Sequence, residues 1–200
     1  MSTIISADEI KKGLPNYSPD KAEQFHREST RQADSVFEKE LKQSTLKEVI
    51  LLCGGAASGK TEFLETHLSS WECIIFDATL STEETAKNKI SKTRKSKKKL
   101  IIYAVIPDDL KRAFLAFLNR DRKFPDTYFY KTHSGSRSTL LFIAKNHPEI
   151  ELNIIESSYT EDQKLQFARY SFKDKQQLID FITSFQLTEA GIISQLEHKL

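Results

Sequence analysis

Apolar runs alternate with amphipathic segments along most of the chain. Four runs have the length and apolar content of buried strands, at residues 49–52, 71–80, 100–106 and 151–156. Apolar residues at spacings near three and four predict helices at 83–90, 110–119 and 138–145. This alternation is typical of folds in which helices cover both faces of a mostly parallel sheet. We predict a three-layer α/β sandwich with about four or five strands, forming one domain over residues 1–200.

The two ends of the chain have different patterns. Residues 1–17 contain Gly13 and Pro15 among turn-forming residues, which predicts a flexible arm. Ser18 followed by Pro19 is typical of a helix start, and the apolar spacing that follows predicts one leading amphipathic helix over residues 18–44, with a single break left open. For residues 160–200 we predict an edge strand at 164–170 and closing helices at 173–185 and 188–200.

The strongest chemical signal follows the first apolar run. The pattern G-x-x-x-x-G-K-[ST] is complete in Gly54, Gly55, Ala56, Ala57, Ser58, Gly59, Lys60 and Thr61. Glycines at these positions let backbone N–H groups face phosphate oxygens at a helix N-terminus. Lys60 would reach the β- and γ-phosphates and Thr61 would hold Mg²⁺. A plain glycine turn is the alternative, but strand, turn and helix in this order favour a site for ATP and Mg²⁺.

A carboxylate, Asp77, ends the next apolar run. In α/β nucleotide enzymes, a carboxylate at the C-terminal end of a strand beside the phosphate loop is typical of a Mg²⁺ ligand or a general base. The structural alternative is that Asp77 caps a helix starting near Ser81. The sequence favours the catalytic or metal-binding role and leaves the cap open.

Three arginines form a second candidate group. Arg120, Arg122 and Arg137 flank an aromatic stretch and a Ser-Gly-Ser sequence that we expect to be a flexible turn. Arginines on a mobile segment near bound phosphate can neutralise the charge that develops during phosphoryl transfer, whereas surface ion pairs are the alternative. We expect His26 to be a partly exposed surface residue, with contact to nucleotide or substrate as the alternative, and we assign no role to His133.

Composition and charge give little indication of a partner. The net charge of +2 favours neither nucleic acid nor a membrane surface. Residues 92–99 are rich in lysine, but they lack interleaved aromatic residues, so we interpret them as a solvated helix end. No apolar run approaches the roughly 18 residues of a membrane span, and no signal peptide is evident, so we expect a cytoplasmic protein with two buried free thiols, Cys53 and Cys73.

The order of the motifs resembles the zeta toxin family of P-loop kinases. The resemblance rests on residues 25–29, the loop 54–61, the strand end 77–80, and the segments 120–122 and 132–137. It implies transfer of the ATP γ-phosphate to a hydroxyl of a UDP-amino sugar such as UDP-N-acetylglucosamine, and a small antitoxin partner. It also implies that Lys60 and Thr61 bind ATP and Mg²⁺, and that Arg120, Arg122 and Arg137 are lid residues on the transferring phosphate.

One interval departs from the family pattern. Family members usually have two strands after the loop, the first carrying an aspartate base followed closely by arginine. Here a single predicted strand, ending in Asp77, occupies the interval. Two hypotheses follow: a small-molecule kinase in which Asp77 replaces the base, or a catalytically impaired nucleotide-binding module that acts through a protein partner.

Overall fold

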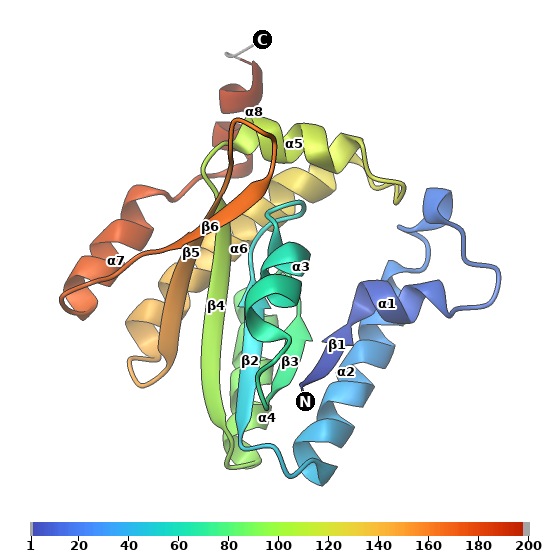
Figure 1. Ribbon diagram of the computed structural model, residues 1–200, viewed down its shortest axis with the longest axis vertical. Coiled ribbons are helices and arrows are strands. Elements are labelled where there is room, and N and C mark those ends of the chain that lie inside the picture. Colours follow the sequence, from blue (N-terminus) through green and yellow to red (C-terminus); the bar gives the residue numbers. More distant parts are fainter. Residues whose placement is uncertain (1, 198–200) are drawn as a thin grey trace.

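The computed structural model describes residues 2–197 and contains one six-stranded sheet flanked by helices (Figure 1). The strand order is β1-β3-β2-β4-β5-β6. All neighbouring strands are parallel except β5 and β6, which are antiparallel. This confirms the predicted α/β class. The strands are β1 Thr3–Ser6, β2 Glu48–Cys53, β3 Ile74–Asp77, β4 Lys99–Pro107, β5 Glu151–Tyr159 and β6 Leu165–Arg169.

Helices cover both faces of the sheet (Figure 1). Side chains of α2, α4, α6 and α7 pack on one face, and those of α3 with the π-helical turn η2 pack on the other. The helices are α1 Ala7–Lys12, the 3₁₀ turn η1 Pro19–Lys21, α2 His26–Gln43, α3 Lys60–Phe63, η2 Leu64–Leu68, α4 Glu83–Lys95, α5 Leu110–Leu118, α6 Asp126–Asn146, α7 Lys175–Ser184 and α8 Glu189–Glu197.

The central strand β2 explains why the sheet needs two helical layers. Val49 and Leu51 belong to the core under α2, α4 and α6, whereas Ile50 and Leu52 belong to the core under α3 and η2. All four side chains are completely buried. Because successive strand residues point to opposite faces, a continuous apolar run requires cover on both sides.

The N-terminal segment differs from the flexible arm that we predicted. Residues 3–6 form β1 and pair in parallel with β3 from Ile74 to Asp77. The Ser6 hydroxyl then accepts a hydrogen bond from the backbone N–H of Asp8 and caps α1. The turn residues Gly13 and Pro15 lie after α1, so the turn-forming pattern applies only to the end of this segment. Residue 1 lies outside the described residues. The apolar pair Ile4 and Ile5 is too short to be recognised as a strand without its partner.

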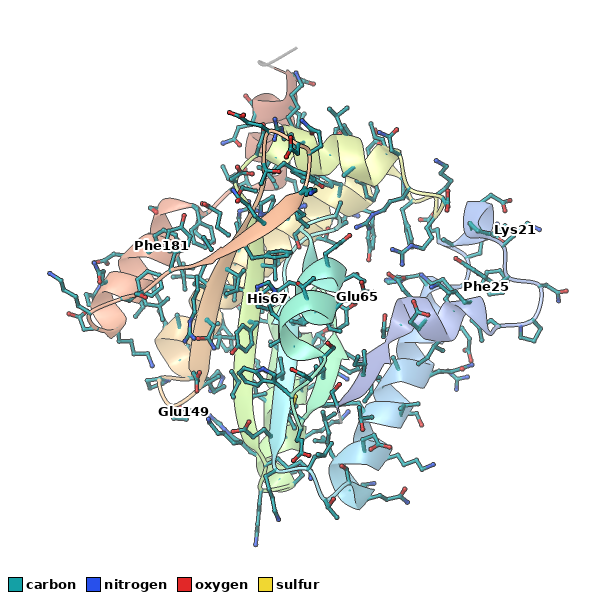
Figure 2. All side chains as sticks on the ribbon, in the orientation of Figure 1. Lys21, Phe25, Glu65, His67, Glu149 and Phe181 are labelled. Carbon is teal, nitrogen blue, oxygen red and sulfur yellow. The ribbon has the colours of Figure 1, made fainter. Side chains whose placement is uncertain are left out.

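The predicted leading helix is interrupted. Residues 19–21 form η1, and α2 begins only at His26. Lys21 and Phe25 lie on this connecting segment, away from the sheet (Figure 2). At the other end, the predicted edge strand and closing helices correspond to β6, α7 and α8, except for residues 198–200, which lie outside the described residues.

The predicted Ser-Gly-Ser turn is also wrong, because it lies inside α6. This helix runs without a break from Asp126 to Asn146. A side chain at Gly135 would place its Cβ 2.2 Å from the carbonyl oxygen of Ser81. The glycine therefore permits close packing of α6 against the segment after β3, and it does not mark a turn. In the part of the chain that the structure describes, no helix is long and apolar enough to cross a membrane.

Candidate phosphate-binding site and cavity

The loop between β2 and α3 has the conformation that its glycines allow. Gly54 and Gly59 have φ angles of 141° and 85°, in a region that side chains disfavour, and Ala57 also has a positive φ of 59°. α3 begins at Lys60, so the loop ends at a helix N-terminus. The predicted strand, glycine loop and helix are therefore present together.

The Lys60 ammonium lies folded over this loop. Its Nζ donates hydrogen bonds to the carbonyl oxygens of Gly54 at 2.9 Å and Gly55 at 2.8 Å. Burial lowers the pKa of Lys60, and the nearby carboxylate of Asp77 acts in the opposite direction. The Ser58 hydroxyl accepts a third hydrogen bond from Nζ at 3.4 Å. A flexible cation held by neutral groups can turn towards a bound anion without breaking an ion pair.

Two neighbouring residues of α6 support the loop from behind. The Thr132 hydroxyl accepts a hydrogen bond from the backbone N–H of Ala56 at 3.0 Å. The His133 Nε2 lies 2.8 Å from the carbonyl oxygen of Ala56. A carbonyl only accepts, so Nε2 carries the proton, and Nδ1 accepts from the Arg137 guanidinium at 3.2 Å. Burial and the charge of Arg137 lower the pKa of His133 well below its usual value, which keeps the ring neutral.

A cavity of about 520 Å³ opens beside the loop, at the C-terminal ends of the strands. Its lining comes from the loop itself, the ends of β1 and β3, helices α1 and α2, and the segment after α5. The lining contains charged, hydroxyl and aromatic side chains. The lining residues include Ser6, Asp8, His26, Thr30, Lys60, Thr61, Asp77, Ser81, Thr85, Arg120, Arg122, Phe124 and Tyr128.

Asp77 lies in this cavity at the end of β3. Burial raises its pKa, and the positive charge of Lys60 opposes that shift. Asp77 does not cap the following helix, because the Thr82 hydroxyl accepts the hydrogen bond from the N–H of Thr85 and is the N-cap of α4. The capping alternative is therefore wrong. A carboxylate beside the lysine of a phosphate loop remains available for a metal or a substrate.

The structure separates the three predicted arginines. Arg120 and Arg122 line the cavity, on the segment between α5 and α6. Burial lowers the pKa of Arg120, and the like charge of Arg122 adds to the effect. Arg137 points elsewhere: its Nη1 donates to the His133 carbonyl oxygen at 3.0 Å, and its side chain lines a different cavity beside α7. Arg137 is therefore not brought to the site.

The N-terminal residues at the site were missed by sequence analysis. Asp8 lines the cavity and forms ion pairs with Arg122 and with Lys11. The segment after α5 is also tied to this region through the backbone N–H of Lys123, which donates to the Pro19 carbonyl oxygen at 3.0 Å. In Figure 1 the loop after α5 reaches towards η1. Only the polar pair Ser6 and Asp8 after an apolar stretch could have signalled a strand end.

His26 is a cavity residue and not a plain surface residue. Its ring contacts Phe124 and Tyr128 edge to face, with centroids 5.6 and 5.5 Å away, and the latter two rings stack at 4.4 Å. Burial lowers the pKa of His26. The three rings therefore form one aromatic cluster in the lining of the cavity.

The lysine-rich segment contributes to structure at the opposite end of the sheet. Lys92 pairs with Glu38 at 2.6 Å, Lys98 donates to the Ser44 carbonyl oxygen at 2.8 Å, and Arg94 pairs with Glu149, which lies at the margin of the molecule (Figure 2). These contacts join α4 to α2 and to the start of β5. Three of the basic residues in this run thus have structural partners.

Comparison with known proteins adds evidence at the level of the fold. No protein family model matches the sequence, and no curated protein is similar to it in sequence. A chain of the AvrRxo1-ORF1:-ORF2 complex with ATP superposes with a TM-score of 0.52 and 13% identity, over 80% of this chain and 74% of that chain. The native form of the complex gives 0.50 and 14%, over 84% and 79%.

A chain of the PezAT chromosomal toxin-antitoxin system of Streptococcus pneumoniae is also similar, at a TM-score of 0.38 and 12% identity, over 84% of this chain and 93% of that chain. The chain therefore shares its fold with the AvrRxo1-ORF1:-ORF2 structures. At these identities the likeness describes the fold alone.

The residues present fit a magnesium ion shared with a nucleotide. The Thr61 hydroxyl and the Asp77 carboxylate both line the cavity, and both are the oxygen ligands that Mg²⁺ prefers. Among the described residues there is no group of three or more histidine, cysteine, aspartate or glutamate side chains that could hold a metal alone. Mg²⁺ usually takes only one or two protein ligands together with phosphate oxygens and waters, so this donor set suffices.

Proposed function

We propose that the protein is an ATP-dependent phosphotransferase, which moves the γ-phosphate of ATP to a hydroxyl of a small molecule. The observation that carries the proposal is the convergence of the phosphate loop, Lys60, Asp77 and two arginines around one cavity. Phosphoryl transfer needs little covalent chemistry from the protein, so positioned charges of this kind supply most of the catalysis. The similar AvrRxo1-ORF1:-ORF2 structure with ATP supports the choice of nucleotide.

Each residue has a role that follows from its place. The loop N–H groups and Lys60 would bind the β- and γ-phosphates, and Arg120 would stabilise the charge that grows on the transferring group. Thr61 and Asp77 would hold Mg²⁺, which when bound neutralises phosphate charge. Lys60 leaves its two carbonyl partners for phosphate oxygens as the nucleotide enters.

The acceptor that we propose is a UDP-amino sugar or a metabolite of similar size. The cavity volume of about 520 Å³ accommodates a molecule of that class. Hydroxyl groups of Thr30, Ser81 and Thr85 line one part and suit a polyhydroxyl ring, and the stacked Phe124 and Tyr128 suit a planar base.

We also propose a protein partner that restrains the activity, in the manner of an antitoxin. The similar AvrRxo1-ORF1 structures contain ORF2, which supports a complex. Co-purification of this chain with the product of an adjacent reading frame, and loss of transfer when that product is added, would support the partner. Undiminished transfer in a purified complex would contradict it.

The function is tested by transfer of ³²P from γ-labelled ATP to UDP-N-acetylglucosamine, other UDP-sugars and nucleosides, with the Lys60→Ala variant beside the wild type. We expect the variant to lose transfer by about 10²-fold or more, because the phosphates lose their principal cation. Lys131→Ala removes an exposed lysine of α6 and is the matched control. Full transfer by Lys60→Ala contradicts the proposal, and ATP binding by the wild type without any labelled product favours a binding module.

A further inference from the structure

The strand missing from the interval after the phosphate loop is supplied by the N-terminus. β1 precedes the loop in sequence, yet it lies next to β3 on the side away from β2, with Ser6 level with Asp77. Parallel strands are about 4.8 Å apart, so the end of β1 lies about 10 Å from the end of β2. Three parallel strand ends therefore point into one cavity: the phosphate loop, then Asp77, then the turn into α1.

Asp8 is the carboxylate at the far end of this row. It lies in the first turn of α1, two residues after β1 ends, and its side chain lines the cavity. Arg122 and Lys11 both pair with it, Lys11 at 3.2 Å, and 41% of the Asp8 side chain remains exposed. The carboxylate is thus held in place by two cations and still accessible from the cavity.

Asp8 follows β1, one strand farther from the phosphate loop than Asp77, and this position suits a different role. Asp77 lies beside Lys60 and so on the side of the nucleotide phosphates. An acceptor must approach the γ-phosphate from the side opposite ADP, because the attacking and leaving oxygens are roughly in line. The strand order places β1 at the end of the row away from the loop, so we assign the acceptor to the β1 end. Asp77 therefore fits the metal and Asp8 fits the acceptor.

Resting on the proposed kinase function, we propose that Asp8 is the catalytic residue that contacts the acceptor hydroxyl and takes its proton. The acceptor oxygen forms a bond to the γ-phosphorus, the bond between that phosphorus and the β,γ-bridging oxygen breaks, and ADP leaves with the electron pair. The hydroxyl proton passes to the Asp8 carboxylate and then to water. Positioned proton acceptors of this kind contribute about 10²- to 10⁴-fold.

The surroundings of Asp8 keep it ready for this role. Burial would raise its pKa, but the charges of Arg122 and Lys11 outweigh burial and hold the pKa below its ordinary value. The carboxylate is therefore ionised at neutral pH. Because Arg122 also lies on the segment after α5, its pairing with Asp8 links the acceptor side of the cavity to the arginine segment.

The test compares Asp8→Asn with Glu9→Gln. Both substitutions remove one negative charge from the first turn of α1, but Glu9 is exposed and pairs only with Lys12 in its own helix. For each variant, ATP affinity is measured by calorimetry, and turnover is measured both as transfer to UDP-N-acetylglucosamine and as ATP hydrolysis. Hydrolysis is included because water can take the place of the acceptor.

We expect Asp8→Asn to lower turnover by about 10²-fold or more while the Kd for ATP changes less than about threefold, and Glu9→Gln to behave as wild type. If Asp8→Asn keeps wild-type turnover while Lys60→Ala is inactive, the result contradicts the role of Asp8 but not the kinase function. Equal loss of ATP affinity and turnover in Asp8→Asn shows a structural residue and also contradicts it. A wild-type chain with neither transfer nor hydrolysis contradicts the kinase function as well.

Discussion

The Nε2 of His133 donates a hydrogen bond to the carbonyl oxygen of Ala56, 2.8 Å away, and so joins α6 to the phosphate loop. The two residues are 77 positions apart in sequence. A Cβ at Gly55 would lie 2.3 Å from the His133 ring, so the ring also fills the space that the glycine leaves. The conformation of the loop therefore depends on contacts with α6 as well as on its own glycines.

Replacing His133 should therefore act first on the conformation of the phosphate loop, and only through the loop on phosphoryl transfer. His133→Ala removes a donor to the carbonyl of the buried Ala56 and leaves a void, so we expect the free energy of unfolding to fall by about 2–4 kcal/mol. His133→Gln can still place an amide N–H near Ala56 and should recover part of that loss. Urea denaturation measures both. Equal stability of the wild type and His133→Ala would show that the hydrogen bond contributes little.

The neutral His133 ring also predicts a dependence of stability on pH. Its pKa in the folded protein lies well below 6.5, whereas in the unfolded chain it should be near 6.5. The unfolded state therefore gains a proton first as pH falls, and the free energy of unfolding should decrease by about 1 kcal/mol for each pH unit below 6.5. His26 and His147 act in the same direction. The free energy of unfolding is measured at pH 7.5 and 5.5, and the decrease should be smaller in His133→Gln than in the wild type.

Gly135 and Gly191 offer a matched pair of helical glycines. A Cβ at Gly135 would lie 2.2 Å from the Ser81 backbone, whereas at Gly191 the nearest atom is the Thr188 hydroxyl at 3.4 Å. Gly135→Ala should lower the free energy of unfolding by about 1–3 kcal/mol through overpacking. Gly191→Ala should raise it by up to about 1 kcal/mol through helix propensity. Thermal unfolding of the two variants tests the prediction, and stabilisation by both would refute it.

The phosphate loop and most strands of the sheet could be predicted from the sequence, because each corresponds to a continuous local pattern of residues. The run before Gly54 and the residues to Thr61 form a continuous signal. The apolar runs 49–53 in β2 and 100–106 in β4 have the length and composition of buried strands. Asp77 was placed correctly in the cavity because a strand end beside the loop fixes its position.

The rest of the site depends on contacts between distant segments. β1 has four residues and is defined only by its pairing with β3, so local periodicity could not separate it from an arm. Gly135 has the composition of a turn and is helical because Ser81 packs against it. Asp8 and His133 became site residues through the positions of α1 and α6, which no spacing in the sequence records.

Arg120 and Arg137 should respond differently to replacement, although the sequence grouped them together. Arg120 lines the cavity, so Arg120→Ala should lower transfer by about 10²- to 10³-fold with little change in the free energy of unfolding. Arg137 is buried and bonded to His133, so Arg137→Ala should mainly lower stability, by about 1–3 kcal/mol. Its effect on turnover per folded molecule should be at least tenfold smaller than that of Arg120→Ala. Paired measurements of turnover and urea denaturation decide the question, because a lid role for Arg137 requires the loss of turnover to exceed the loss of stability.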